Sequence, residues 1–194
     1  MRKRKYKLVK RDFIIHEGRK LYRIKALKTV GMFSEVSKGD IGGYVEGYHN
    51  LSQEGKCWIF HDAKVYGNAR VKDSATIGGD AEIFGNAEVK EYSAVGNNAK
   101  IYGNAKICGF SRVTSNTVVF DNVEISDNSD IFGNCNLIYG NALLKGKASI
   151  IRCQSVCHVS DNVLIESVIK IDSNKSLVEL SGNSVIQEFT EIEE

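Results

Sequence analysis

Hydrophobic and polar residues follow a six-residue period over residues 57–137. A six-residue period fits neither the 3.6 residues per turn of an amphipathic helix nor the simple alternation of a long strand. It is typical of a parallel β-helix, in which short strands and tight corners form stacked coils. The position two residues before each aliphatic position holds nothing larger than valine, most often alanine. The aliphatic positions are Ile59, Val65, Val71, Ile77, Ile83, Val89, Val95, Ile101, Ile107, Val113, Val119, Ile125, Ile131 and Leu137.

The polar positions of the repeat predict the corners of the coil. Glycine and asparagine tolerate positive φ, and asparagine can hydrogen-bond the backbone through a turn. Glycine is frequent two residues after the aliphatic position, as at Gly67, Gly85 and Gly103. Asparagine is frequent at the next position, at residues 68, 86, 98, 104, 116, 122, 128 and 134.

A second period of 18 residues predicts three corners in each coil. Charges of alternating sign recur at this spacing, so neighbouring coils would attract each other; one such series is Arg70, Glu88, Lys106 and Glu124. Outward aromatic residues recur at the same spacing, at Tyr66, Phe84, Tyr102 and Phe120. The sequence therefore predicts an all-β solenoid, a triangular parallel β-helix with 18-residue coils.

The N-terminal segment predicts a cap for this solenoid. Tyr6–Ile15 and Lys20–Lys28 have the composition of strands, and residues 16–19 between them are typical of a hairpin turn. Such a hairpin would cover the open end of the first coil. We predict about seven coils. The predicted parts are a basic cap (1–56), the β-helix (57–187, regular over 57–137 and distorted over 138–187) and a frayed acidic tail (188–194).

Charge and cysteine content narrow the functional classes. The net charge is +2, but residues 1–28 carry +10, which leaves −8 for the rest. The basic cluster at the start is interpreted as a solvated terminus, with a nucleic-acid contact as the alternative; it comprises Arg2, Lys3, Arg4 and Lys5. No apolar run suits a membrane span or a signal peptide. The five cysteines lack paired spacing, so we predict a cytoplasmic protein that does not bind membranes.

Several motifs together point to a family. The chain resembles the YdcK-like hexapeptide-repeat proteins of bacteria and their phages in four stretches: Leu21–Leu27, Lys38–Tyr44, Asn50–Ser52 and Cys57-Trp58, followed by repeated Tyr-Gly-Asn-Ala. The resemblance covers most of the chain and implies a left-handed β-helix. Members are often labelled acyltransferases, because hexapeptide acyltransferases share the fold. A shared fold does not establish a function, which must be argued from a site.

Catalysis would require a histidine in a suitable setting. The resemblance to hexapeptide acyltransferases implies a histidine base at a cleft between subunits of a trimer. None of the four histidines lies in a recognisable catalytic motif, and the regular coils contain no inserted loop. His158, near Cys153 and Cys157, is the one candidate for chemistry; the competing interpretation is a corner histidine beside two buried thiols. No metal site is predicted, because a further ligand would be needed.

The outward aromatic residues have two interpretations that are compatible with each other. They form either a stacked ladder or an exposed interface for protein binding. We therefore expect a non-catalytic scaffold, without a cofactor, whose flat faces bind a protein partner or another copy, as a dimer or trimer. The family context suggests a phage or prophage protein that acts on a host factor. The alternatives are an acyltransferase that uses acetyl-CoA, and a nucleic-acid-binding protein that uses the basic N-terminus.

Overall fold

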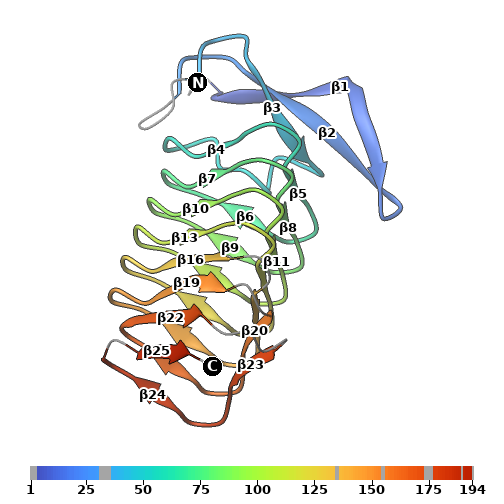
Figure 1. Cartoon of the computed structure of the whole chain (residues 1–194). Helices are drawn as coiled ribbons and strands as arrows, with labels where there is room; N and C mark the ends of the chain where they lie inside the picture. The colour runs from blue at the N-terminus through green and yellow to red at the C-terminus, as the bar shows by residue number, and fades with distance from the viewer. Residues whose placement is uncertain are drawn as a thin grey trace.

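The computed structural model describes residues 4–30, 36–133, 136–153, 156–172, 177–188 and 190–193. Within these ranges the regular elements are all β-strands, stacked as a parallel solenoid of about seven turns (Figure 1). No helix in the described part of the chain is long and apolar enough to cross a membrane. The predicted all-β solenoid is confirmed.

Three sheets form the three faces of the solenoid among the described residues. Face A consists of β1 (Tyr6–His16), β2 (Arg19–Ala26), β3 (Ile41–Val45), β5 (Lys64–Val65), β8 (Glu82–Ile83), β11 (Lys100–Ile101), β14 (Val118–Val119), β17 (Asn136–Ile138), β20 (Val156–Val159) and β23 (Leu177–Leu180). Face B consists of β4 (Trp58–Ile59), β7 (Thr76–Ile77), β10 (Ala94–Val95), β13 (Arg112–Val113), β16 (Asp130–Gly133), β19 (Ser149–Cys153), β22 (Val168–Asp172) and β25 (Thr190–Glu193). Face C consists of β6 (Arg70–Val71), β9 (Glu88–Val89), β12 (Lys106–Ile107), β15 (Glu124–Ile125), β18 (Leu143–Leu144), β21 (Leu164–Ile165) and β24 (Val185–Ile186).

Successive coils in the regular part pair at the spacing that the sequence predicts, 18 residues per turn. Ile101 of β11 lies beside Ile83 on one side and Val119 on the other. The backbone N–H of each coil donates to a carbonyl of the next, as Phe84 does to Ile101 at 3.0 Å. The aliphatic residues from Ile59 to Ile131 are all buried. They form the central column that the six-residue period predicts, and their burial is the main stabilising contribution.

The first change of register occurs earlier than the sequence predicted. Val113 pairs with Ile131 and keeps the regular spacing, but Val119 pairs with Ile138, so this coil contains one added residue. Ile138 is fully buried and Leu137 is half-buried. The prediction that Leu137 continues the interior column and that the register breaks after it is therefore wrong. Both residues are aliphatic, so the pattern alone does not distinguish them.

The C-terminal coils are longer than the regular ones. On face A, Asn136 pairs with Cys157 and Val156 pairs with Leu177, and both separations exceed the regular repeat. The strand β25 pairs with β22 at the end of face B (Figure 1). The predicted frayed tail of residues 188–194 therefore includes a strand, because its backbone continues the parallel ladder.

The N-terminal cap begins with the predicted hairpin. The strands β1 and β2 are antiparallel, and Glu17 and Gly18 turn between them with φ of 48° and 72°. The strand β3 pairs antiparallel with β2 and parallel with β5, so it joins the hairpin to the coils (Figure 1). Glycine is required at position 42, because a Cβ atom there would lie 2.5 Å from the Ile59 carbonyl oxygen.

The cap supplies hydrogen-bond donors to carbonyl groups of the first coil, which has no coil before it. Many N–H groups of each coil donate to carbonyls of the following coil, as Tyr66 does to Ile83, so the corresponding carbonyls of the first coil need donors from the cap. On face A, the N–H groups of β3 donate instead, as Tyr44 does to Ala63 at 2.9 Å. At the next corner, the buried Asn50 amide donates to the Gly67 and Ala69 carbonyls, both at 3.0 Å.

Face B receives its donor from the buried Lys5 side chain. The Lys5 Nζ donates to the Cys57 carbonyl at 2.9 Å and to the Glu54 carbonyl at 3.1 Å. It also lies 3.1 Å from the Cys57 Sγ. Burial lowers the pKa of Lys5, although contact with Cys57 opposes that shift. Burial also raises the pKa of the Cys57 thiol. The first coil is thus closed by backbone donors on faces A and C, by the Asn50 amide at the corner between them and by the Lys5 amine on face B.

Candidate functional site

A continuous column of aromatic rings runs along one edge of face A. Consecutive rings are stacked, with centroids 4.7–5.2 Å apart and interplanar angles of 5–9°. Each ring follows a face A strand and lies over the ring of the next coil. The members of this aromatic column are Tyr66, Phe84, Tyr102, Phe120 and Tyr139. The predicted 18-residue series is therefore a stacked ladder, extended by Tyr139.

A histidine contacts each end of the aromatic column. His16, at the end of β1, meets Tyr66 edge-on at 5.3 Å, and its Nε2 lies 3.3 Å from the Glu82 carboxylate. His158 meets Tyr139 edge-on at 6.4 Å. The Tyr66 hydroxyl donates to Glu82 at 3.3 Å. Burial, reinforced by the nearby carboxylates, raises the pKa of Tyr66 well above its ordinary value, so the ring stays neutral.

The aromatic column is less exposed than the interface interpretation requires. Tyr66 is only 2% exposed, and Phe84, Tyr102 and Phe120 are half-buried. The stacked neighbours cover the ring faces and leave mainly the edges to solvent. Stacking of this kind contributes about 0.5–1.5 kcal/mol per pair beyond area burial, so the column stabilises the alignment of the coils. A role in binding stays a prediction.

A second pair of stacked rings is exposed. Tyr92 and Phe110 lie at the corner between faces C and B, with centroids 4.8 Å apart and planes 5° from parallel. Tyr92 is 41% exposed and Phe110 is 60% exposed. We call them the aromatic pair. The sequence interpretation missed it, although both residues stand at the corner position where asparagine is common, 18 residues apart.

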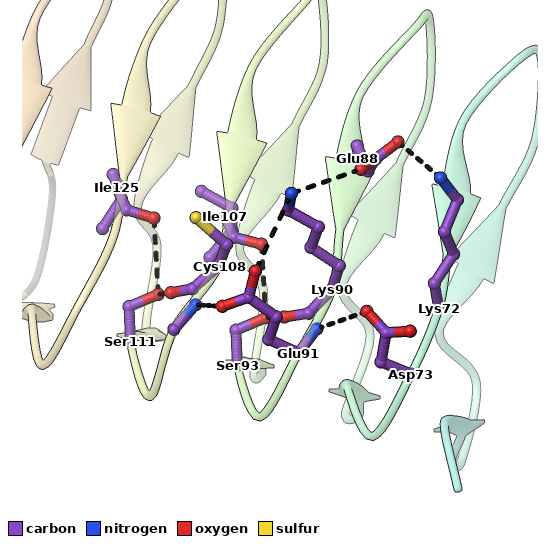
Figure 2. Close-up of polar contacts among 11 residues, drawn as sticks. Lys72, Asp73, Glu88, Lys90, Glu91, Ser93, Ile107, Cys108, Ser111 and Ile125 are labelled. Carbon is purple, nitrogen blue, oxygen red and sulfur yellow. Dashed lines mark hydrogen bonds and ion pairs between the residues drawn. The ribbon is translucent and has the colours of Figure 1, made fainter. Parts of the chain in front are cut away.

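The corner beneath the aromatic pair is held rigidly by hydrogen bonds (Figure 2). The buried Ser93 hydroxyl donates to the Lys90 carbonyl at 2.6 Å, and Ser111 repeats this contact one coil later at 2.5 Å. The Asp73 carboxylate accepts the Glu91 N–H at 3.2 Å, and the Glu91 carboxylate accepts the Gly109 N–H at 2.8 Å. The two rings therefore project from an ordered backbone.

Ion pairs bind the coils on face C beside this corner (Figure 2). Lys72 lies 2.9 Å from Glu88, and Lys90 lies 3.9 Å from it. Burial favours a higher pKa for Glu88, but these lysines and Arg70 outweigh it, so the pKa lies below its ordinary value. The predicted stacking of Arg70 on Glu88 is confirmed as strand pairing, although Lys72 is the closer cation.

Face B carries a shallow hollow at the edge opposite the aromatic pair. The hollow has a volume of about 460 Å³, and it is bounded by Phe60 at one end and by Arg112 and Thr114 at the other. Its floor is made of small residues: Thr76, Gly78, Ala94 and Gly96. The corresponding outward positions of face A carry the aromatic column. We call this feature the glycine hollow.

Another hollow of about 460 Å³ lies where the hairpin turn meets the aromatic column. The Arg19 Nη1 donates to both carboxylate oxygens of Glu46, at 3.0 and 3.1 Å. His49 places its Nε2 2.8 Å from the Gly67 carbonyl oxygen. A carbonyl only accepts hydrogen bonds, so this nitrogen is the donor. The polar groups here therefore pair mainly with one another.

The structure separates His158 from its neighbouring thiol. Both residues lie on β20, where Cys157 is fully buried and the His158 ring faces outward onto Tyr139. Adjacent strand residues point to opposite sides. Cys157 and His158 therefore point to opposite sides of β20, and a chemical role for His158 stays a prediction; the side chain of Cys153 lies outside the described residues. No three His, Cys, Asp or Glu side chains in the described ranges gather as metal ligands.

The structure also corrects the interpretation of the basic terminus. Lys5 is buried in the cap and cannot contact a nucleic acid. The Arg4 guanidinium lies 4.9 Å from the Tyr48 ring centre and donates to its hydroxyl at 3.3 Å. Arg2 and Lys3 lie outside the described residues. The predicted solvated tag therefore ends before Lys5, which belongs to the folded cap.

Comparisons with known proteins do not assign this chain to a family. No protein-family model matches the chain, and no curated protein matches it. The surface features of the solenoid are therefore the basis for inferring its function.

Proposed function

We propose that this protein is a non-catalytic solenoid scaffold that binds a protein partner or a second copy of itself through its flat faces. The aromatic pair is the observation that carries the proposal. Phe110 is 60% exposed although it stacks on Tyr92. Aromatic residues are enriched in protein interfaces. An exposed ring held on an ordered corner is therefore suited to anchoring a partner.

The resemblance to YdcK-like proteins supports a setting in the cytoplasm of a bacterium, with a phage or prophage origin. A host protein is then one class of partner. The repeated coils support such a role, because a solenoid presents extended flat surfaces with little change of shape.

Binding by the full-length protein tests this proposal. Immobilised wild type should retain copies of itself or a bacterial protein, and Phe110→Asn should abolish that retention. Asparagine is suitable because Asn128 occupies the same corner one coil later. Charged substitutions of Phe84 or Tyr102 are less informative, because each ring stacks on two neighbours and a charge would disturb the coils.

Two controls separate this function from catalysis. His49→Ala and His158→Ala should leave retention unchanged, because neither residue contacts the aromatic pair. Calorimetry with acetyl-CoA at about 1 mM, which detects even weak binding, should give no binding heat. Binding of acetyl-CoA, or retention that persists in Phe110→Asn, would argue against the scaffold.

A further inference from the structure

The glycine hollow exists because side chains are absent where the fold would accept them. Neither Gly78 nor Gly96 has a positive φ. A Cβ atom at Gly78 would come no closer than 3.8 Å to its neighbours, and one at Gly96 no closer than 3.7 Å. These are ordinary contacts, in contrast to the severe clash at Gly42. The backbone therefore does not require glycine here, and its effect is to keep the surface open.

The aromatic pair matches this opening in spacing. The two rings lie 4.8 Å apart because they come from successive coils. Gly78 and Gly96 are likewise one coil apart, since β7 pairs with β10. The ring pair precedes β10 and β13 at one edge of face B, whereas the glycines follow β7 and β10 at the other edge. Face B is thus flanked by exposed rings at one edge and by a recess at the other, and the rings stand one coil further along the solenoid than the glycines.

The two edges of face B also carry charges of opposite sign. The corner of the aromatic pair carries Asp73, Glu91 and Asp127 at equivalent places of the repeat, with Gly109 in the coil between the last two, and Lys90 lies 3.8 Å from Glu91. The glycine hollow is bordered by Arg112, whose side chain is 64% exposed and approaches Asp130 only at 3.9 Å. The Glu91 side chain, which is 46% exposed beside Lys90, therefore has a second cation available on another copy. Complementary charges favour correct orientation more than raw affinity.

The size of face B suits a weak dimer. Eight strands about 4.8 Å apart and a width of about 20 Å give a face of about 650 Å². Two such faces bury about 1,300 Å², which is near the lower limit for specific interfaces. A two-fold axis that lies along the face, slightly inclined to the solenoid axis, brings the aromatic edge of each copy over the recessed edge of the other and takes up the one-coil offset between rings and glycines, as an isologous interface requires.

We propose that the partner is a second copy of this chain, packed face B against face B, with the aromatic pair of each copy in the glycine hollow of the other. This inference rests on the proposed function and specifies its partner. Arg112 of each copy then faces the acidic corner of the other. The aromatic column on face A takes no part in the contact.

Mass in solution tests the dimer directly. Light scattering and sedimentation equilibrium on the full chain, from about 1 µM to about 1 mM, cover the affinities of weak dimers. Wild type should approach the mass of a dimer as concentration rises. Phe110→Asn and Gly96→Lys should each weaken association at least tenfold, the first by removing the projection and the second by filling the recess.

The matched control is Phe13→Ser, because Phe13 is 43% exposed on the hairpin, away from face B; this variant should still dimerise. Melting temperatures identify any variant that fails to fold, in which case the other variant decides. A monomeric or trimeric wild type, or a dimer that survives both substitutions, would overturn the proposal. A monomer that still retains a bacterial protein through Phe110 would overturn the dimer and leave the scaffold function standing.

Discussion

The buried Lys5 offers the sharpest test of how the solenoid is closed. Lys5→Met keeps most of the aliphatic stem but removes the donor to the Cys57 carbonyl, which lies in a buried setting. A buried acceptor left without its donor costs about 1–3 kcal/mol. The Glu54 carbonyl is nearer to solvent and can bind water instead. Relief from burying an amine offsets part of this cost, so we expect a net loss of about 1–2 kcal/mol.

Thermal unfolding and hydrogen exchange measure this loss. For a chain of this size, 1 kcal/mol corresponds to about 2–4 °C in Tm. Because a solenoid is stabilised by contacts between neighbouring coils, amides of the cap and of β4 should exchange faster than those of β11. Lys7→Met is the matched control, since Lys7 is exposed on β1, which begins directly after Lys5. Equal melting temperatures and equal exchange in both variants would refute the capping role of Lys5.

Two further substitutions test the core and the ion pairs. Ile101→Asp should prevent folding, because it buries an unpaired carboxylate in the central column; a soluble variant with an unchanged Tm would show that the interior assignment is wrong. Glu88→Gln should cost about 0.3–1 kcal/mol near neutral pH. Since the pKa of Glu88 is lowered by folding, this contribution is present above the unfolded pKa and lost as pH falls through the folded one. Urea unfolding should therefore show the two proteins converging below about pH 4, and a constant difference would exclude an ionic origin.

The coils could be predicted because each six-residue repeat over 57–131 places a branched or small residue at the same positions. A branched residue such as Ile101 fits the interior, and a small residue such as Ala99 fits the inward bend beside it. The same period placed Tyr66 and Phe84 in one column. The handedness of the β-helix could not be predicted from the period, because left-handed and right-handed coils bring the same residues inward. The family resemblance alone supplied that expectation.

Features that depend on one residue were harder to predict. Lys5 looks like part of a basic tail, and only the unmet carbonyl of Cys57 explains its burial. The aromatic pair was overlooked because Tyr92 and Phe110 replace residues of the corner rather than of the outward column. Their regular separation was nevertheless visible, and it would have predicted their stacking. The glycine hollow required the structure, because sequence alone does not show whether Gly96 is needed by the backbone.

The long C-terminal coils show which corner aligns the solenoid. Between faces A and C, the buried residues stay six apart throughout, as from Val65 to Val71 and from Ile138 to Leu144. Between faces B and A the spacing grows to seven from Ile131 to Ile138 and to nine from Ile150 to Val159. All the added length of these coils therefore avoids the corner that carries the aromatic column.

That constant corner also carries a continuous chain of asparagine side chains. Each amide donates to the next one at 2.9–3.2 Å, although the coils lengthen from 18 to 21 residues; the chain runs through Asn68, Asn86, Asn104, Asn122, Asn141, Asn162 and Asn183. An inner member both donates and accepts, so an added residue here would break two hydrogen bonds and shift a stacked ring. At the corner between faces B and A, where Asn98 donates to Asn116, the described residues form no chain of comparable length. Insertions at that corner leave the asparagine chain and the aromatic column in register.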